Sequence, residues 1–285
     1  MSLRPPIDPK EEHLMTALNL DKIARDVKSA QDYVAELQPV TEGHPDFDLP
    51  AAYDVAGRLH HRRIAEGARV AGRKIGFTNP DMWTLFGVSE PVWGYVYDHT
   101  LTECPEAVMR FDLKKLCQPR IEPEIILHFR EAPAVGAREP EILRCIDWIA
   151  HGIEIVQSHF PDWKFKASDT VADNGLHGAL IIGPHIDVDQ LGDNLPSDLE
   201  TFSLELSCDG EVKEKGYGRN VLGSPLTAVA HLLKLLHSQG DVAPIKAGEV
   251  ITTGTITKAY PIKPGERWST RLDGIALSGF ELTFA

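Results

Sequence analysis

Apolar residues recur at steps of three and four along the first part of the chain. This spacing predicts a helix between residues 10 and 40, because positions three and four apart share one helix face. The repeating positions are Leu14, Leu18, Ile23, Val27, Ala30, Val34 and Leu37. Pro39 and the polar run after it end the pattern. A second helix is predicted to begin at Pro50 and to end before Gly67.

From residue 69 onward, short apolar runs are separated by Gly, Pro and Asp, which is typical of strands and loops. The predicted strands are Arg73–Phe77, Arg120–Phe129, Ala179–Gly183, Phe202–Cys208, Glu249–Thr255 and Gly279–Phe284. Two further helices are predicted over Glu139–Ala150 and Pro225–Gln239. Helices first and strands afterwards favour an α+β fold with a large mixed sheet or roll. We expect an N-terminal helical segment (1–68) and a β-roll domain (69–285), joined in one integrated unit.

The charge balance of the chain narrows the range of partners. Of 285 residues, 29 are Lys or Arg and 42 are Asp or Glu, which gives a formal net charge of −13. Nucleic acids and anionic membranes both require a basic face, so neither is an expected partner. The sequence also has no glycine-rich nucleotide-binding motif.

Apolar run lengths and cysteine spacing indicate the cellular compartment. No apolar run is long enough for a membrane span, and we expect no secretory signal at the N-terminus. The four cysteines are scattered without the spacing of a metal site. Reduced thiols in a cytoplasmic protein are therefore expected.

Two acids stand close together at the start of one predicted strand. Glu122 and Glu124 are two positions apart, so an extended backbone points both side chains to the same face. Like carboxylates repel, which leaves three outcomes: solvent exposure, a raised pKa on one of them, or a cation between them. Pro123 has no N–H to donate, so this segment is predicted to be an edge strand or a strand start.

A third acid changes the weight of these alternatives. Glu154 lies between Ile153 and Ile155, after a helix predicted around Trp148, and is expected to be buried. Three inward carboxylates without thiolates form a site of hard oxygen ligands. Mg²⁺ or Mn²⁺ is the natural occupant, with water or an oxygen-rich substrate in the remaining positions.

Lys74 lies in a short predicted strand bounded by Gly72 and Gly76. Most lysines are solvated, and that alternative holds if the segment is taken alone. A buried lysine beside a metal would instead be an electrostatic catalyst or a proton carrier, because burial lowers the pKa of lysine.

An ordered series of motifs resembles one enzyme family. The series is KIGFT, RIEPEI, GIEIVQS and DTVADN, followed by LGSPL, KAGE, TGT and LDGIA towards the C-terminus. It is similar to the 2-keto-4-pentenoate hydratase and 4-oxalocrotonate decarboxylase family, within the fumarylacetoacetate hydrolase superfamily. The resemblance extends from about residue 48 to the C-terminus. It implies a mixed β-sheet roll of the fumarylacetoacetate hydrolase type, a homo-oligomer, and a possible complex with a pathway partner enzyme.

The resemblance also implies roles for individual residues. The residues that match the family's metal carboxylates are Glu122, Glu124 and Glu154. Lys74 matches its active-site lysine. The residues that match segments near the substrate are Asp173, Asn174, Gly254 and Thr255.

The implied activity is that of a lyase on short 2-oxo or 2-hydroxy-dienoic acids, dependent on Mg²⁺ or Mn²⁺ and proceeding through a metal-bound dienolate. A 2-keto-4-pentenoate hydratase is the main expectation, and a 4-oxalocrotonate decarboxylase is the alternative. An acylpyruvate-type hydrolase would need a histidine paired with an acid, and the sequence reveals no such dyad. An inactive partner subunit is a further alternative, which the retained charged residues disfavour.

Two positions depart from the hydratase pattern. Val92 stands where hydratases of the family tend to carry an acid, which moves weight towards decarboxylation. The stretch from Gly175 to Gly178 contains His177 where small residues are usual. His177 is predicted either to act as a catalytic acid or base in contact with the substrate, or to be a wall residue of the pocket.

Overall fold

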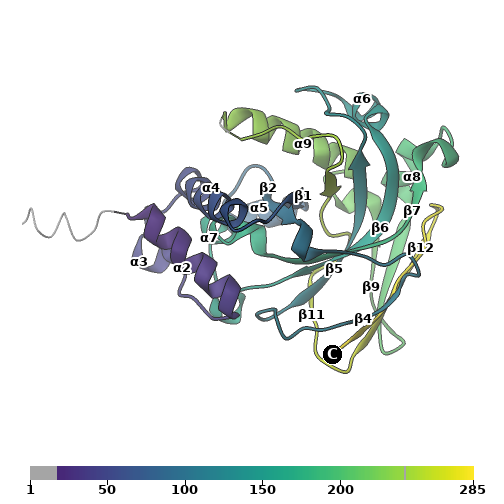
Figure 1. Cartoon of the computed structure of the whole chain (residues 1–285). Coiled ribbons are helices and arrows are strands. Elements are labelled where there is room, and N and C mark those ends of the chain that lie inside the picture. Colours follow the sequence, from purple (N-terminus) through teal and green to yellow (C-terminus); the bar gives the residue numbers. More distant parts are fainter. Residues whose placement is uncertain (1–17, 241) are drawn as a thin grey trace, which may run out of the picture.

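The computed structural model describes residues 18–240 and 242–285, and helices open the described part (Figure 1). They are α2 (Leu20–Tyr33), α3 (Val40–Gly43) and α4 (Leu49–Ala65). The side chains of Asn19 and Asp48 accept hydrogen bonds at the starts of α2 and α4. Both long helices predicted here are present, but the first ends at Tyr33 and does not continue to residue 40, because Val34 adopts a left-handed conformation. Residues 10–17 lie outside the described residues. No helix in the two described ranges is long and apolar enough to cross a membrane.

One large sheet contains most of the long strands. In spatial order it consists of β2 (Val92–Tyr97), β1 (Val70–Gly76), β10 (Val250–Thr252), β5 (Arg120–Phe129), β6 (Ile146–Val156), β7 (His177–Asp187) and β3 (Leu101–Glu103). The short strand β11 (Tyr260–Pro261) also pairs with β5. The pairs β1–β10 and β3–β7 are parallel and the others antiparallel, so the predicted mixed sheet is confirmed.

This sheet curls so strongly that strands near its two ends approach each other. β2 contacts β7, and only the 3₁₀ turn η1 (Asp98–Thr100) separates β2 from β3. The inner face of the curl is filled by a small apolar cluster. Its buried members are Val96, Ile126, Ala150, Leu180, Ile182 and Val250. The cluster closes the middle of the roll, so polar chemistry on this face is confined to the ends of the strands.

The outer face of the sheet packs against the main core (Figure 1). The helices that contribute to this core are α6 (Glu139–Arg144), α8 (Leu195–Thr201) and α9 (Pro225–Ser238). A second sheet joins it, in the order β4 (Val108–Phe111), β13 (Glu281–Phe284), β12 (Arg267–Asp273), β8 (Ser203–Cys208) and β9 (Glu211–Tyr217). The remaining helical segments are α5 (Pro80–Phe86), α7 (Ala167–Ala172), η2 (Pro161–Trp163), η3 (Asn174–Leu176), η4 (Val188–Gln190) and η5 (Gly218–Asn220).

The N-terminal helices lie beside one end of the roll (Figure 1). α4 contacts α2 and α7, and a separate apolar cluster joins these helices to Val92 on β2. Val92 is therefore a buried packing residue between the helices and the sheet.

The predicted helix over Glu139–Ala150 is wrong in its second half. α6 ends at Arg144, and Trp148 lies in β6, opposite His128 of β5. The apolar residues of this segment fit both helical and extended spacing. Pairing with β5 and β7 on either side decides in favour of a strand.

Of the two alternatives predicted for the segment around Pro123, the edge strand is wrong, because β5 is an interior strand, and the strand start is confirmed, because β5 begins at Arg120. β10 pairs with β5 from Ile126 onward, and β11 pairs with it up to Ile121. Pro123 lies in the gap between these two neighbours, where its carbonyl accepts a hydrogen bond from the Ile256 N–H. The N–H that proline lacks would point into the same gap, so no β5–β6 hydrogen bond is lost.

Candidate active site

Strand pairing brings the predicted charged residues to one end of the inner face. Glu122 lies directly opposite Glu154 in the β5–β6 pair, and Glu124 lies on the same side of β5. Lys74 of β1 is opposite Thr252 of β10, which is opposite Ile126 of the inner apolar cluster. Because side chains alternate between the two faces of a strand, Lys74 and the three glutamates all point to the inside of the roll.

The three glutamates form a compact cluster. Each carboxylate offers one oxygen, and these oxygens lie within 4.8 Å of one another. Glu124 and Glu154 are 0% exposed, and Glu122 is half-buried. Burial raises the pKa of Glu122 to about 7, and burial together with the two neighbouring carboxylates holds the pKa of Glu124 well above its usual range. The three groups can be charged together only when a cation compensates them.

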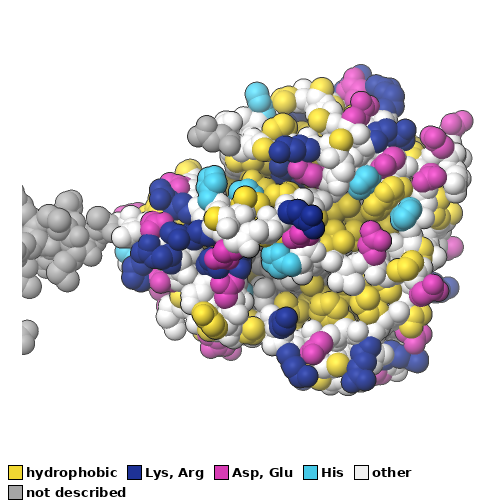
Figure 2. Space-filling view, in the orientation of Figure 1, with side chains coloured by type: hydrophobic (Ala, Val, Ile, Leu, Met, Phe, Trp, Pro, Cys, Tyr) yellow, Lys and Arg dark blue, Asp and Glu magenta, His cyan; other side chains and the backbone are white. Residues whose placement is uncertain are grey.

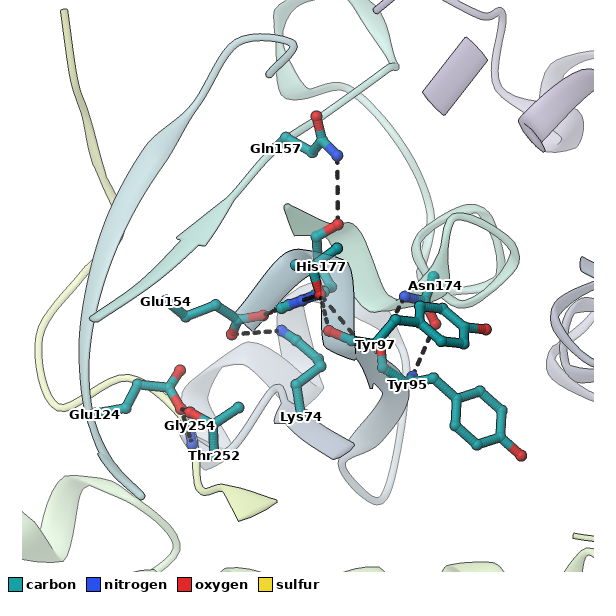
Figure 3. Close-up of polar contacts among 11 residues, drawn as sticks. Lys74, Tyr95, Tyr97, Glu124, Glu154, Gln157, Asn174, His177, Thr252 and Gly254 are labelled. Atoms are coloured by element: carbon teal, nitrogen blue, oxygen red, sulfur yellow. Dashed lines mark hydrogen bonds and ion pairs between the residues drawn. The ribbon is translucent and has the colours of Figure 1, made fainter. Parts of the chain in front are cut away.

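Lys74 supplies one positive charge to this cluster (Figure 3). Its Nζ lies 3.2 Å from Glu154 Oε2, and the side chain is almost completely buried. Burial lowers the pKa of Lys74, but the three carboxylates outweigh burial and raise it above its usual value. Burial alone would raise the pKa of Glu154. Lys74 and His177 lower it by a larger amount, so the pKa of Glu154 lies below its usual value. The sequence-based expectation of a lowered lysine pKa is therefore wrong, because the three acids around the ammonium group outweigh the effect of burial.

Residues of β10 and of the loop after it hold the Glu124 side chain in position (Figure 3). Its Oε2 accepts hydrogen bonds from the Thr252 hydroxyl and, at 2.7 Å, from the Gly254 N–H. Gly254 has a φ of +108°, and a Cβ at this position would lie 2.0 Å from Thr78 Oγ1. Only glycine allows the backbone to donate to Glu124 at this point.

The cluster fits a hard divalent cation. Within residues 18–240 and 242–285, Glu124 Oε1 has no hydrogen-bond partner, and Glu154 Oε2 has only the Lys74 ion pair. A buried carboxylate oxygen without a donor is costly, whereas such oxygens are the preferred ligands of Mg²⁺ and Mn²⁺. In the part of the chain that the structure describes, no thiolate or imidazole joins the three carboxylates as a potential ligand.

His177 lies behind Glu154 (Figure 3). Its Nδ1 lies 2.8 Å from Glu154 Oε1, and its Nε2 lies 2.9 Å from Thr100 Oγ1. Because a carboxylate only accepts, Nδ1 carries the hydrogen of the first bond. Both ring nitrogens are engaged, so the geometry supports a residue that orients Glu154. The predicted contact of His177 with the substrate stays a prediction.

The four residues predicted to lie near the substrate all use their polar groups within the protein. The Asn174 side chain bonds both the N–H and the C=O of Tyr95, as a neighbouring strand would. Asp173 accepts from Gln31, and Thr255 Oγ1 donates to the Thr257 carbonyl at 2.9 Å. The Gly254 N–H is bonded to Glu124, as described above. These bonds hold the wall of the site in place, and substrate contact stays a prediction.

Among the described residues, two histidine–acid pairs have both side chains buried, where the sequence reveals no dyad. Besides His177 and Glu154, His159 Nδ1 lies 2.7 Å from Asp173 Oδ2, and both of these side chains are buried. The partners are separated by 23 and 14 positions. Such spacings have no sequence signature, because the pairs depend on how β6, β7 and α7 meet in space.

The chain matches a known family model, described as the C-terminal domain of fumarylacetoacetate (FAA) hydrolase, over residues 105–278. It is 33% identical over 248 residues to a 2-hydroxyhexa-2,4-dienoate hydratase from Comamonas testosteroni, covering 87% of this chain and 91% of that protein. It is 32% identical over 255 residues to a 4-oxalocrotonate decarboxylase from a Pseudomonas species, covering 89% of this chain and 92% of that protein.

Solved structures agree with these relatives. A 4-oxalocrotonate decarboxylase from Pseudomonas putida, complexed with magnesium and adipate, superposes with a TM-score of 0.84 at 28% identity, over 99% of this chain and 100% of the other. A fumarylpyruvate hydrolase from Pseudomonas aeruginosa, in complex with Mn²⁺ and pyruvate, shares the fold alone. Its TM-score is 0.56 at 14% identity, over 75% of this chain and 88% of the other. The chain therefore belongs to the fumarylacetoacetate hydrolase superfamily, in the family of 2-keto-4-pentenoate hydratases and 4-oxalocrotonate decarboxylases.

Proposed function

We propose that this chain is a divalent-metal-dependent lyase of the 2-keto-4-pentenoate hydratase type, which acts on short 2-oxo and 2-hydroxy-dienoic acids. The observation that carries the proposal is the buried cluster of three carboxylates within 4.8 Å, with Lys74 against it. The similarity to a dienoate hydratase over most of both chains supports the substrate class.

Glu122, Glu124 and Glu154 are proposed to hold Mg²⁺ or Mn²⁺. When bound, such an ion supplies Lewis-acid polarisation of the C2 carbonyl of a 2-oxo acid. The Thr252 hydroxyl and the Gly254 N–H keep Glu124 in position, and His177 does the same for Glu154. These contacts orient the acids before substrate arrives, which is what such supporting hydrogen bonds contribute in metal sites.

Lys74 is proposed to stabilise the negative charge that develops on the substrate. Its ammonium group lies 3.2 Å from Glu154, at the edge of the cluster, so it can donate a charged hydrogen bond to an enolate oxygen. The inner apolar cluster seals the roll behind the site, which strengthens this interaction by excluding water.

A 4-oxalocrotonate decarboxylase is the second candidate. Val92 packs in an apolar cluster at the position where hydratases of the family tend to carry an acid. A group that could activate water is therefore missing at that point. The similarity to a decarboxylase structure over nearly the whole of both chains favours the same candidate.

The proposal is tested by assaying the purified protein with Mg²⁺ against 2-hydroxypenta-2,4-dienoate and 4-oxalocrotonate. Loss of the dienoate absorbance without gas release supports the hydratase, and release of carbon dioxide supports the decarboxylase. The Glu124→Gln variant should be inactive in both assays. If the wild type turns over neither substrate, the proposed lyase activity is wrong.

The assembly rests on the family resemblance, and the location rests on the scattered cysteines, which are expected to be reduced. We propose a homo-oligomer in the cytoplasm, with a pathway partner enzyme as a possible further subunit. Light scattering of the purified protein measures the mass of the particle and therefore tests the first part directly.

A further inference from the structure

His151 lies behind the glutamate cluster, on the opposite face of the large sheet. It belongs to β6 and is directly opposite Ile125 of β5, so the two side chains share one face. Ile125 is part of the main core on the outer face, whereas the Glu124 side chain points to the inside of the roll. His151 is 1% exposed. A polar ring buried in this way needs hydrogen-bond partners within the protein.

The first partner of the His151 ring is the backbone of Glu124. Nδ1 lies 2.9 Å from the Glu124 carbonyl oxygen. Because a carbonyl oxygen only accepts, Nδ1 carries the hydrogen of this bond. The Glu124 carboxylate is held separately, by the Thr252 hydroxyl and the Gly254 N–H. Glu124 is thus held at its backbone and at its Oε2, while its Oε1, which has no hydrogen-bond partner in the described ranges, is left for a cation.

The second partner connects the ring to the second sheet. Nε2 of His151 lies 2.9 Å from the hydroxyl oxygen of Thr270 in β12, and this oxygen accepts a hydrogen bond from the Phe280 N–H at 2.8 Å. Burial lowers the pKa of His151 to about 4, so the ring is neutral near pH 7 and Nε2 accepts the hydroxyl hydrogen. The hydrogen bonds therefore run in one direction, from Phe280 through Thr270 and His151 to the Glu124 carbonyl.

Close packing confines the His151 ring. The Phe280 ring contacts it edge-on, with ring centres 5.3 Å apart. A Cβ at Gly183 of β7 would lie 2.8 Å from the His151 carbonyl oxygen and 2.9 Å from the Phe280 ring, so only glycine allows so close an approach. The ring therefore lies fixed between the large sheet and the second sheet, with both of its nitrogens engaged.

We propose that His151 is a positioning residue for the cation site, because its hydrogen bond to the Glu124 carbonyl fixes this part of β5 relative to the second sheet. It acts through the backbone of Glu124 and contacts neither the cation nor the substrate. Mg²⁺ requires nearly ideal octahedral geometry, so a small displacement of one carboxylate lowers its affinity. The inference rests on the proposed function, since it assumes that Glu124 is a ligand of Mg²⁺ or Mn²⁺.

The alternative is that His151 only joins the two sheets. Its replacement would then lower the stability of the fold and leave the metal affinity of the folded protein unchanged. Two substitutions separate the roles, because both lose the bond to Thr270 and they differ in the donor to Glu124. The amide nitrogen of His151→Asn occupies the place of Nδ1 and carries hydrogen, whereas His151→Phe retains a ring without a donor.

The first measurement is a calorimetric titration of the metal-free, folded protein with Mn²⁺. His151→Phe should bind Mn²⁺ roughly 5- to 10-fold more weakly than the wild type, which corresponds to the loss of one hydrogen bond. His151→Asn should bind within about twofold of the wild type, because it restores the donor. His237→Phe, at an exposed histidine of α9, is the matched control and should bind Mn²⁺ as the wild type does.

The second measurement needs no metal. Glu followed by Ile occurs three times in the chain, at Glu124, Glu141 and Glu154. Labelling the Glu carbonyl with ¹³C and Ile with ¹⁵N therefore gives three directly bonded pairs in an NMR spectrum, and Glu124→Gln identifies the pair of interest. The Glu124 carbonyl resonance should shift in His151→Phe and stay near its wild-type position in His151→Asn. The Glu141 resonance, from α6, should stay unchanged in both variants.

Equal Mn²⁺ affinity of the wild type and His151→Phe would overturn the inference, as would equal losses in His151→Phe and His151→Asn. If His151→Phe does not fold, Thr270→Val removes the hydroxyl at the other end of the ring. Thr270→Val should weaken Mn²⁺ binding by a smaller factor than His151→Phe and Thr270→Ser should restore it, whereas wild-type affinity in Thr270→Val would overturn the link to the second sheet. Failure of the proposed function gives a different result, since then the wild type itself would bind no Mn²⁺ while the Glu124 resonance still shifts in His151→Phe.

Discussion

Four charged side chains with unequal pKa shifts define the site at the scale of single residues. The surrounding charges raise the pKa of Lys74 and lower that of Glu154, whereas Glu122 and Glu124 have raised pKa values. Without a cation, one ammonium group faces three acids, and protonation of a carboxyl relieves the repulsion. A bound dication relieves the same repulsion between the carboxylates without protonation. Metal binding should therefore release the protons that the carboxyl groups hold in its absence.

Replacing Lys74 with Met should lower kcat by roughly 10²- to 10³-fold while the protein stays folded, because the charge that stabilises the developing anion is lost. Steady-state kinetics with Mg²⁺ measures the effect, and circular dichroism checks the fold. Lys114→Met, at a lysine whose side chain is 83% exposed, is the control and should retain full activity. A loss of less than about fivefold in Lys74→Met would show that Lys74 is structural.

His177→Asn should weaken Mg²⁺ binding by roughly 10- to 100-fold, because the hydrogen bond that orients Glu154 is lost. A Mg²⁺ titration of activity should show that excess metal restores most of the turnover. If metal affinity is unchanged and kcat alone falls, His177 acts directly on the substrate instead.

At the scale of elements, long-range contacts set the position of β1, which carries Lys74. Arg73 points to the opposite side of the strand and forms a buried ion pair with Glu249 at 2.8 Å. The same guanidinium donates to the carbonyls of Ala243 and Pro244. This pair fixes β1 to the segment that leads into β10, so the outward neighbour of Lys74 helps to align the site.

Arg73→Met should lower the free energy of unfolding by about 3–5 kcal/mol, because it leaves the Glu249 carboxylate buried without its partner. Urea denaturation measures this change. Arg69→Met removes an ion pair whose arginine side chain is 84% exposed, and it should cost at most about 1 kcal/mol. Similar losses in the two variants would contradict the assigned role of the buried pair.

The strands that the sequence predicts well are those with an unambiguous pattern. Arg120–Phe129 is β5 itself, and Gly279–Phe284 contains β13. β6 is not among the predicted strands. Its first half was predicted as a helix, since its spacing fits both structures and only pairing with β5 and β7 excludes the helix. For the site, residue types and family motifs singled out the three glutamates and Lys74. The partners of His177, Asn174 and Asp173 were not predictable, because they come from elements far apart in the sequence.

At the scale of the whole molecule, the net charge of −13 does not describe every face. Figure 2 shows Lys and Arg side chains gathered over the N-terminal helices, where several pair with acids of α2. These helices meet the roll through His60 of α4, whose ring stacks on Tyr95 and contacts the Tyr97 hydroxyl.

This contact predicts a pH dependence of stability. Burial lowers the pKa of His60 to about 4, with His61 and Arg73 adding to the shift. The unfolded value is about 6.5, so between these limits the unfolded chain binds a proton that the folded chain does not. The contribution of His60 to stability is therefore present above about pH 6.5 and is lost as the pH falls towards about 4.

His60→Phe, which retains a ring for stacking, should reduce the fall of Tm across this pH range. His61→Gln, at the exposed neighbouring position, should show the same change of Tm with pH as the wild type. Thermal unfolding followed by circular dichroism at several pH values measures both variants. If Tm changes with pH in His60→Phe as it does in the wild type, other groups control the acid sensitivity.

A calorimetric titration of metal-free protein with Mn²⁺ measures whether Glu122, Glu124 and Glu154 bind a divalent cation. The wild type and the Glu106→Gln control, at an exposed acid, should each bind one Mn²⁺ per chain. Glu124→Gln should bind Mn²⁺ at least tenfold more weakly, because one of the three carboxylate ligands is lost. Binding of equal strength by wild type and Glu124→Gln, or no binding by the wild type, would contradict the claim.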